Sequence, residues 1–445
     1  MKNFKKTVFI TIAALSMGAV FPYLNMAVDN TYQQLKVIVD VMELIRESYV
    51  EDVDSQKLVY GAARGMVDEL DEFSQFMEPD TYKRVKSDTE GEFGGIGIKL
   101  DMREGWLTVV TPLPGTPAYK AEMWPGDKIV KIEGETTRDM LMEEAIKKLR
   151  GAPGTKLNIT VARESEGKNS DWVNKDITLV REIIKAESVR SRMFDDKIGY
   201  VKVVEFTGHV VEDFNKAVAD LVKQGAAGLI VDLRYNPGGL LSAAVDVAKL
   251  FLDSNKMIVF TKGRKSENYQ EFRAGASAPY PDIPLILLIN RYSASSSEIV
   301  SGAIKDNKRG LIIGERSFGK ASVQSMIPLS DQSALRLTIA KYYTPSGRLI
   351  QRNVKDDTGG ITPDIEVKIP LETEKKLVMK MEEIFYPAGK ADKDKKDKKS
   401  ASPAPGPQEK AADQKKSDSV RDEVLDRALE LLKAREVLGN LTPAK

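Results

Sequence analysis

From residue 198 onward the chain alternates short apolar runs with amphipathic stretches, and this alternation constrains the fold more than any other feature. The runs Leu229-Ile230-Val231 and Leu285–Ile289 contain no polar side chain. Strands that are apolar on both faces have to be covered on both faces, as in the parallel sheets of α/β proteins. Right-handed crossovers through helices are the default connection between such strands. The pattern predicts an α/β core, with strands at 198–205, 228–233, 257–261, 285–290 and 311–313, helices at 211–223 and 240–252, and a hairpin at 325–343.

Two smaller units precede this core. Apolar residues recur at helical spacing between 31 and 50 (Leu35, Ile38, Met42, Ile45), and a second helix is expected from Asp54 as N-cap, with Leu58, Met66 and Leu70 on its apolar face. These helices predict either a module packed on its own chain or a dimerising arm. Residues 90–182 instead predict a compact β-rich unit, with strands at 94–100, 106–111, 128–132, 156–163 and 177–181 and helices at 116–123 and 140–149.

Composition excludes several kinds of chemistry. The 445 residues contain no Cys and one His, so disulfides, cysteine nucleophiles and any metal site with two histidines are excluded. We expect no metal and no cofactor. The formal net charge is +1, which does not indicate a nucleic-acid-binding surface. An enzyme of this composition needs Lys, Asp, Glu, Ser or Tyr for acid–base chemistry. The single histidine, His209, is expected at the start of a helix, capping it or exposed, without a catalytic role.

Both ends of the chain have their own character. Lys2, Lys5 and Lys6 precede an uncharged apolar run, which predicts a secretory signal or an uncleaved inner-membrane anchor and places the rest of the chain in the periplasm or cell envelope. Residues 389–417 are rich in Lys, Asp, Pro and Ala, a composition typical of a disordered linker. Beyond them, Val420, Leu425, Leu429, Leu432 and Leu438 form a helical stripe that predicts either a docking or oligomerisation helix or a helix packed on the core.

The junction after the strand at 285–290 carries the first chemical motif, Ser293-Ala294-Ser295-Ser296-Ser297-Glu298. A hydroxyl at the start of a helix lies beside free N–H groups and the positive end of the helix dipole, which stabilise a developing oxyanion. The alternative is that Ser295 caps the helix, with Glu298 completing a capping box.

Two further motifs follow strands of the same core. Lys320 lies among Phe318, Gly319, Ala321 and Val323; burial lowers the pKa of a lysine, and its neutral amine is a competent general base that Gln324 could hold in place. An exposed lysine without a role is the alternative. The strand at 228–233 leads into Asn236-Pro237-Gly238-Gly239, where glycines let backbone N–H groups approach a ligand; an ordinary tight turn is the alternative.

Taken together, Asp232–Gly239, Ser293–Glu298 and Phe318–Gln324 resemble, in this order, three motifs of the carboxyl-terminal processing, or tail-specific, serine proteases. The resemblance extends from about Thr31 to Pro370 and includes a PDZ-like unit. It implies Ser295 as nucleophile, Lys320 as general base and Gln324 as the group that orients the base. It also implies an oxyanion hole from the N–H groups of Gly239 and Ser296. Asp306 and Glu298 are candidates for an acidic third partner.

The resemblance also implies how substrates are chosen. Gly94, Gly95, Ile96, Gly97 and Ile98 offer N–H groups in a turn that leads into a strand edge, which suits capture of a peptide's carboxylate and addition of its backbone as a strand. Expected partners are protein substrates with exposed apolar C-termini, an activating adaptor, and a second copy of the chain through the N- or C-terminal helices. In this family the PDZ unit can also gate the catalytic centre.

These inferences define a mixed α/β and α+β chain: residues 1–27 signal or anchor, 28–88 helical module, 89–182 PDZ-like domain, 183–388 β/α spiral-type serine protease core, 389–418 charged linker and 419–445 C-terminal helix. The expected activity is that of an endopeptidase cleaving proteins near their C-termini. Two other classes are a non-catalytic PDZ adaptor that recruits C-termini for another protease, and an acyl-thioester enzyme of related architecture, which the PDZ-like unit and the secretion signal disfavour.

Overall fold

The computed structural model describes residues 32–113, 115–164, 172–194, 196–353, 355–370, 372–374, 376–377 and 421–441. The N-terminal signal and the 389–418 linker expected from the sequence lie outside these residues. The described chain forms two compact units, one of residues up to Tyr82 together with Gln324–Thr338, the other of Lys83–Val323 and the residues from Ile339 onward.

The first unit combines helices with one short strand and with parts of both strands of the expected hairpin. A helix at 32–48 is followed by α2 (Ser55–Asp68), β1 (Gln75–Met77) and the start of α3 (Pro79–Glu90). Asp54 caps α2 as expected, its side chain accepting the N–H of Gln56 at 2.8 Å. β1 pairs antiparallel with the first residues of β18 (Ala334–Tyr343), the second strand of the expected hairpin, in which β17 (Ser322–Pro328) pairs with β18.

The buried face of α2 differs from the prediction. Met66 and Leu70 are more than half exposed, whereas Tyr60 and Val67 are buried and pack with Phe76. The reason is that Phe76 of β1 and Leu335 of β18 together present an apolar surface to the Tyr60 side of the helix, and Leu70 already lies beyond the helix end. Sequence spacing identified the helix but not the face that finds a partner.

In the second unit, the β-rich part forms a sheet of order β3-β4-β5-β7-β8, with β6 on β5. Its apolar core is covered by α5 and includes Leu107, Ile129, Ala145 and Leu157. Strands β2 and β9 form a separate antiparallel ribbon. The bounds are β2 Glu92–Gly95, β3 Ile98–Arg103, β4 Trp106–Pro112, α4 Pro117–Lys120, β5 Lys128–Ile132, β6 Glu135–Thr136, α5 Met142–Leu149, β7 Lys156–Glu164, β8 Trp172–Val180 and β9 Glu182–Lys185.

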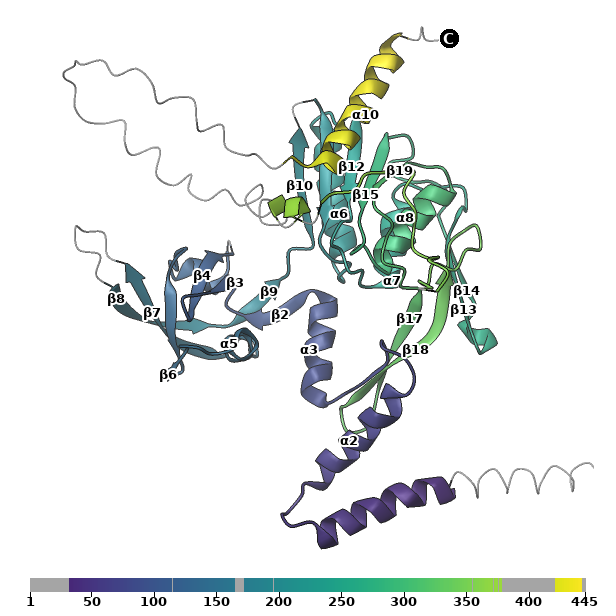
Figure 1. Ribbon diagram of the computed structural model, residues 1–445. Coiled ribbons are helices and arrows are strands. Elements are labelled where there is room, and N and C mark those ends of the chain that lie inside the picture. The colour runs from purple at the N-terminus through teal and green to yellow at the C-terminus, as the bar shows by residue number, and fades with distance from the viewer. Residues whose placement is uncertain are drawn as a thin grey trace, which may run out of the picture. The chain divides into compact units, whose positions relative to one another are not determined.

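The α/β core is a six-stranded sheet of order β10-β11-β12-β15-β16-β19, parallel except for the antiparallel edge strand β10 (Figure 1). Its elements are β10 Val189–Phe194, β11 Ile198–Val203, α6 Val210–Lys223, β12 Gly228–Asp232, α7 Leu241–Lys249, β15 Leu285–Ile289, α8 Ser296–Asp306, β16 Leu311–Gly314, β19 Ile365–Glu366 and α10 Glu423–Leu441.

Both faces of this sheet are covered, as the apolar strands predicted. Because successive side chains of a strand point to opposite faces, Leu229 and Val231 pack under α6, α7 and α8, whereas Ile230 faces the other way. There it meets Val424, Ala428 and Leu432 of α10. Of the two expectations for the C-terminal stripe, the structure therefore shows the helix packed on the core.

The apolar run at 257–261 was predicted as a strand of the α/β core but does not join the six-stranded sheet. Strand β13 (Met257–Gly263) pairs with β14 (Gln270–Arg273) and with the end of β18, and a short 3-10 turn (Ser266–Asn268) joins β13 to β14. Strand β10, with the sequence Val-Arg-Ser-Arg-Met-Phe, takes the antiparallel edge position. Apolar content identified β13 as a buried strand, but pairing with β18 is a long-range choice that local pattern does not contain.

Candidate active site

The three motifs meet because β12, β15 and β16 are consecutive parallel strands, so their carboxyl ends lie at one edge of the sheet. The segment after β12 ends at Gly239, the segment after β15 leads through Ser295 into α8, and the segment after β16 carries Lys320. The sheet thus brings together Ser295, Ser296, Glu298 and the segments carrying Gly239 and Lys320.

Ser295 is the N-cap of α8 and has an unusual backbone conformation. Its φ is 51° and its ψ is −111°, a region that strongly favours glycine. The capping-box pair with Glu298 is present as well, so the capping and chemical interpretations of this junction are compatible. A half-buried serine in a strained turn at a helix N-terminus is where a chemical role for strain is expected.

The neighbouring serines have structural tasks. Ser293, Ser296 and Ser297 are fully buried. Their hydroxyls donate to the carbonyl oxygens of Leu233 (2.9 Å), Gly239 (2.9 Å) and Asn236 (3.1 Å), respectively. These three hydroxyls join the start of α8 to the segment after β12. Among the four serines of the cluster, Ser295 is therefore the one that is not fully buried.

Glu298 connects the serine to the lysine segment. It is fully buried, and its Oε2 accepts the backbone N–H groups of both Ser295 (2.8 Å) and Lys320 (2.9 Å). Its Oε1 accepts the N–H of Gly319 and the hydroxyl of Ser317. Burial raises the pKa of Glu298 to about 7, although all four donors act to lower it. Glu298 contacts the backbones of Ser295 and Lys320, which makes it a group that holds the two segments together.

Tyr342, which the sequence did not single out, holds the same two residues from their carbonyl side. Its buried hydroxyl lies within hydrogen-bond distance of the carbonyl oxygen of Ser295 (3.0 Å) and of the carbonyl oxygen of Lys320. Burial, together with the charge of Glu298, raises the pKa of this phenol well above its usual range, so the hydroxyl remains a donor. Nothing in the local sequence marks Tyr342, because β18 reaches the site only through sheet pairing.

The Gly-Gly segment packs directly against the serine. A Cβ atom added to Gly238 would lie 2.7 Å from the Cβ of Ser295, and one added to Gly239, with φ of 134°, would lie 2.2 Å from the carbonyl oxygen of Phe206. Glycine is therefore required at both positions. Within the described part of the chain, the N–H groups of Gly239 and Ser296 have no hydrogen-bond acceptor. Unpaired N–H groups beside a serine are what an oxyanion needs.

Asp306 lies away from Ser295, and Gln324 is part of the first unit. Asp306 is at the far end of α8, ten residues along the helix from Ser296, or about 15 Å at 1.5 Å per residue. There it accepts the N–H of Ser346 at 3.0 Å. The structure does not bring it to Ser295. Gln324 belongs to the first unit, where its side-chain amide donates to the carbonyl of Phe73.

His209 is the N-cap residue of α6, at the helix start that the sequence predicted, but the ring is largely buried. Its Nδ1 lies 3.3 Å from the carbonyl oxygen of Glu90 and its Nε2 3.0 Å from that of Ala186. Glu90 precedes β2 and Ala186 follows β9, so the ring lies at the base of the ribbon. Of the two expectations, exposure was wrong, because the segments at Glu90 and Ala186 cover the ring, and His209 stands at the N-cap position without a side-chain capping hydrogen bond.

The five residues proposed for peptide capture divide between two structures. Gly94 and Gly95 belong to the ribbon, paired with Ile183 and Glu182 of β9. Gly97, with φ of +71°, makes the turn, and Ile98 begins β3, the terminal strand of its sheet. Within the described residues, the N–H groups of Ile96 and Gly97 have no acceptor. The turn and strand edge that could receive a peptide therefore comprise residues 96–98, fewer than the five residues proposed from the sequence.

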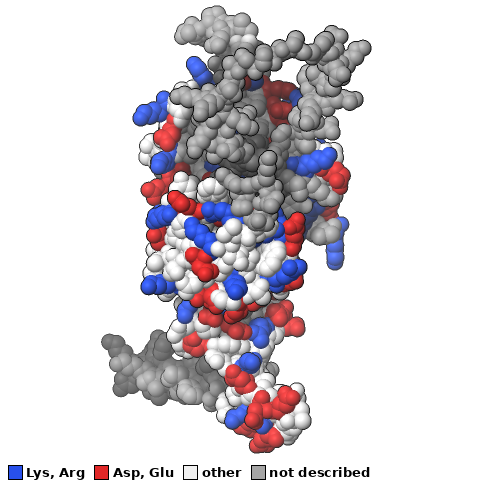
Figure 2. All heavy atoms as spheres, turned by 90° about the vertical axis from the view of Figure 1, so that its left-hand side faces the viewer, with Lys and Arg blue, Asp and Glu red and all other residues white. Residues whose placement is uncertain are grey.

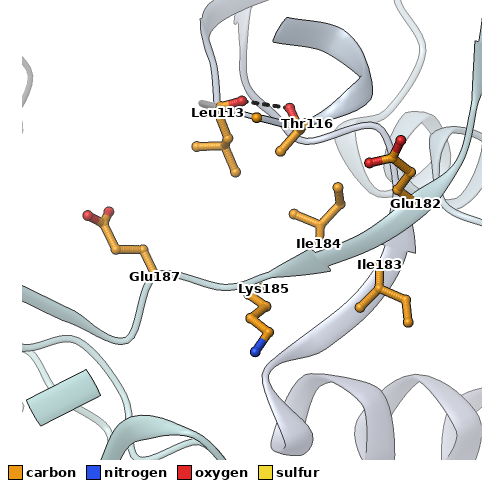
Figure 3. A pocket seen from close by; sticks show the side chains of 8 residues that line it. Leu113, Thr116, Glu182, Ile183, Ile184, Lys185 and Glu187 are labelled. Atoms are coloured by element: carbon orange, nitrogen blue, oxygen red, sulfur yellow. Dashed lines mark hydrogen bonds between the residues drawn. The ribbon is translucent and has the colours of Figure 1, made fainter. Parts of the chain in front are cut away.

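A cavity of about 380 Å³ lies beside this turn (Figure 3). Leu113, Gly115 and Thr116 line one side, and Ile183, Ile184 and Lys185 of β9 line the other. Thr116 donates its hydroxyl to the carbonyl of Leu113 and also lies 3.0 Å from the carbonyl oxygen of Gly97. The cavity wall is thus tied directly to the turn at Gly97.

Charge and metal-ligand chemistry add little to these sites. On the face in Figure 2, positive and negative side chains are interspersed without a patch of one sign. The described ranges contain no cluster of three or more His, Asp or Glu residues able to hold a metal ion. No helix within them is both long and apolar enough to cross a bilayer.

A serine at a strained helix start, backbone-linked to a lysine segment and accompanied by a PDZ-type unit, defines a serine-type peptidase. Sequence comparison agrees: residues 197–367 match peptidase family S41, residues 108–163 match a PDZ domain, and residues 19–81 match the "activating protease CtpB N-terminal domain". The chain belongs to the carboxy-terminal-processing proteases of family S41.

The relatives that establish the family cover most of the chain. The carboxy-terminal-processing protease of Bartonella bacilliformis is 42% identical over 346 residues, which is 77% of each chain. The carboxy-terminal processing protease CtpA of Bacillus subtilis is 32% identical, covering 74% of this chain and 68% of the relative. Among solved structures, the photosystem II D1 C-terminal processing protease is 28% identical, with a TM-score of 0.43, covering 74% of this chain and 92% of that one.

Proposed function

We propose that this chain is an envelope serine endopeptidase that cleaves proteins near their C-termini, with Ser295 as nucleophile and Lys320 as general base. The observation that carries the proposal is the double backbone connection between these residues, through Glu298 on the N–H side and Tyr342 on the carbonyl side. A nucleophile and its base must keep a fixed mutual geometry. This connection supplies it through the backbones of both residues.

The proposed reaction uses these groups in turn. The neutral amine of Lys320 takes the proton of the Ser295 hydroxyl as Oγ attacks the scissile carbonyl carbon. The N–H groups of Gly239 and Ser296 stabilise the oxyanion that forms. The lysine ammonium then protonates the leaving amine, the C–N bond breaks, and an acyl-enzyme remains. Water, deprotonated by Lys320, hydrolyses the ester and restores the serine.

We also propose Gln324 as the group that orients the base. Its amide nitrogen donates to the Phe73 carbonyl, which leaves the amide oxygen as the end suited to accept from a lysine amine. A Gln324→Ala variant is expected to lose activity, but less than Lys320→Ala. Neither acidic candidate acts as a third catalytic partner in this scheme. Glu298 holds the backbones of Ser295 and Lys320, and Asp306 takes no part.

Substrate capture is assigned to the PDZ domain. Strand β3 is the terminal strand of its sheet, so an extended peptide can pair with it, and the N–H groups of Ile96 and Gly97 can receive the terminal carboxylate. Ile98, Leu100 and Met102 lie partly buried along β3 and favour apolar tails. Residues 89–182 are the proposed extent of this domain, and 183–388 that of the protease core.

Location and assembly complete the proposal. The basic, then apolar, N-terminus supports export, with the signal either cleaved or kept as an anchor. The match of residues 19–81 supports activation by a partner protein. Leu35 and Ile38 on the 32–48 helix are exposed, which supports contact with a second copy or an adaptor. Separating membrane from soluble periplasmic fractions, and measuring solution mass, tests these points.

The catalytic assignment is tested with a serine-directed fluorophosphonate probe and a protein substrate with an apolar C-terminus. Wild-type protein should label at Ser295 and release a C-terminal fragment, whereas Ser295→Ala and Lys320→Ala should do neither. His209→Ala is the control and should keep turnover. Fragment release by Lys320→Ala would contradict the assignment, and absence of labelling in wild type with intact peptide binding would point to a PDZ adaptor.

The capture site is tested with Gly97→Ala. A Cβ there would lie 2.3 Å from the Cβ of Thr116, and the positive φ adds strain. The KM for a tailed substrate should rise at least tenfold, while hydrolysis of a short untailed peptide stays unchanged. Gly126→Ala is the matched control, because Gly126 also has a positive φ but an added Cβ would meet open space. Equal effects of the two variants would refute the role of the Gly97 turn.

A further inference from the structure

Arg234, the third residue of the Asp232–Gly239 segment, makes two buried ion pairs. Its Nε and Nη2 donate to Asp232, and its Nη1 and Nη2 donate to the two oxygens of Asp422, both at 2.8 Å. Arg234 is 3% exposed. A paired, bidentate contact fixes the plane of a guanidinium group, so Asp232 and Asp422 together fix how Arg234 is oriented.

The next residue, Tyr235, is held in a similar way. Its hydroxyl donates to Oε1 of Glu374 at 2.8 Å, and Oε2 of Glu374 pairs with Arg291 in the segment before Ser295. The ring of Tyr235 stacks on Tyr292, with ring centroids 5.7 Å apart. Glu374 is buried. One carboxylate therefore links the segment after β12 to the segment after β15.

The backbone that follows these contacts contains one strained residue. Tyr235 has a φ of 59°, which is unusual for a residue with a side chain, whereas the positive φ angles of Gly238 and Gly239 are ordinary for glycine. A strained conformation persists only where surrounding contacts hold it. Asn236 supplies part of the restraint, since its side chain donates to the carbonyl of Val203 and accepts the N–H of Gly238. Arg234 pairs with Asp232 of its own segment, and Arg234 and Tyr235 also contact carboxylates from outside it, those of Asp422 and Glu374.

Both carboxylates come from the C-terminal part of the chain, beyond residue 367, where the match to family S41 ends. Glu374 precedes residues 378–420, and Asp422 follows them, immediately before α10. Helix α10 is fixed on the sheet by Val424, Ala428 and Leu432 (Figure 1). The same docking that covers the sheet face thus delivers Asp422 to Arg234.

We propose that Asp422 and Glu374 are positioning residues for catalysis: from the two sides of residues 378–420 they hold Arg234 and Tyr235 and thereby set the N–H of Gly239 against the oxyanion. This inference rests on the proposed function, which assigns that N–H to the oxyanion hole. It gives the C-terminal helix a part in the reaction, in addition to covering the sheet.

The test compares Asp422→Asn with Asp426→Asn in the full-length protein. Both changes neutralise a carboxylate near the start of α10, but Asp426 contacts Arg421 in an exposed pair, away from the active-site segments. The first readout is amide hydrogen exchange of residues 235–240, which needs no activity. The second is kinetic: kcat, KM, and affinity for a peptide aldehyde, whose hemiacetal oxygen occupies the position of the oxyanion.

Asp422→Asn should speed exchange of residues 235–240 at least tenfold, while the amides of Leu425–Leu432 stay protected. It should lower kcat and aldehyde affinity together by about tenfold, since a small misplacement of a catalytic group has effects of this order or larger. KM should stay within twofold. Asp422→Glu should recover part of the loss, and Asp426→Asn should match wild type.

Tyr235→Phe provides a second variant that keeps the stacked ring and removes only the contact to Glu374. It should also speed exchange of residues 235–240 and lower kcat and aldehyde affinity, but by less than Asp422→Asn. Unchanged exchange in both variants would overturn the inference, and so would faster exchange with wild-type kcat and aldehyde affinity. If wild-type protein failed to label at Ser295, the proposed function would fail, and the exchange data alone would still decide whether Asp422 holds the segment.

Discussion

The PDZ domain and the protease core each bury an aspartate against an arginine, and the two pairs are used differently. In the PDZ domain, Asp127 accepts two hydrogen bonds from Arg163 at 2.7 Å and the N–H of Trp124, while Arg163 donates to the carbonyl of Glu122. All partners lie in one strand and the turn it covers. This pair closes a single local loop.

In the core, Asp232 and Arg234 make further contacts beyond their own pair. Asp232 also accepts the hydroxyl of Tyr200, and Lys202 lies 3.4 Å away. Burial alone would raise the pKa of Asp232, but Arg234 and Lys202 hold it well below its usual range. Arg234 continues to Asp422 of another segment. A local pair secures one turn, whereas an extended network relates segments far apart in the sequence.

The comparison predicts that breaking a core connection impairs chemistry, whereas breaking the PDZ pair impairs only that domain. The largest effect is expected for Glu298→Gln. An amide NH2 must replace one oxygen, so two of the four donors would face another donor. We expect kcat to fall at least a hundredfold, comparable to losing an oxyanion donor. Steady-state kinetics with Ser301→Ala as control check this; a loss below tenfold would break the comparison.

A second prediction concerns pH. Because burial raises the pKa of Glu298 to about 7, the folded state binds this proton over a range where the unfolded state, with an ordinary glutamate pKa, has released it. Stability therefore falls as pH rises through about 4.3 to 7, by about 4 kcal/mol in total. Urea unfolding at pH 5 and pH 8 should show this loss in wild type relative to Glu298→Gln, which does not titrate. Parallel curves for the two proteins would contradict it.

Tyr342→Phe should have a smaller effect. It removes one buried hydroxyl and leaves the carbonyl groups of Ser295 and Lys320 without this donor, while Glu298 still holds their N–H groups. We expect about tenfold lower kcat and about 1–2 kcal/mol lower unfolding free energy. Tyr269→Phe, at an exposed site, is the control. If kcat stayed at the wild-type level, the carbonyl-side connection would be irrelevant to the reaction.

The smallest effect on chemistry is expected for Asp127→Ala. Removing one partner of a buried pair should destabilise the PDZ domain by about 3 kcal/mol. Hydrolysis of a short untailed peptide should stay within twofold of wild type. Hydrogen exchange of β5 and β7 measures the first effect, and Glu135→Ala, which removes an exposed pair with Lys148, is the control. A large fall in short-peptide kcat would show that the PDZ pair reaches the core after all.

Much of this architecture could be predicted from the sequence, because local signals encode it. Apolar runs located β12 and β15, Asp54 marked the start of α2, and the motif positions placed Ser295 and the Lys320 segment at the ends of neighbouring strands. The two-sided burial of the sheet followed from strands without polar residues. These features depend on residues close together in the chain.

The features that could not be predicted depend on pairing between distant segments. Tyr342 reaches the site because β18 pairs with β13, and Asp422 reaches Arg234 because α10 docks on the sheet. Gly94 and Gly95 enter a ribbon because β9 lies opposite them. Spacing along one segment contains no information on which partner it meets, and the misjudged face of α2 has the same cause.

The backbone at Ser295 has a consequence for evolution and engineering. With φ of 51° and ψ of −111°, this position would be occupied at lower conformational energy by glycine. A Ser295→Gly variant should therefore unfold at a higher temperature than wild type, although it has lost the hydroxyl. With Ser295 as the proposed nucleophile, this residue lowers stability in exchange for reactivity, and a single substitution would give a more stable, inactive protein.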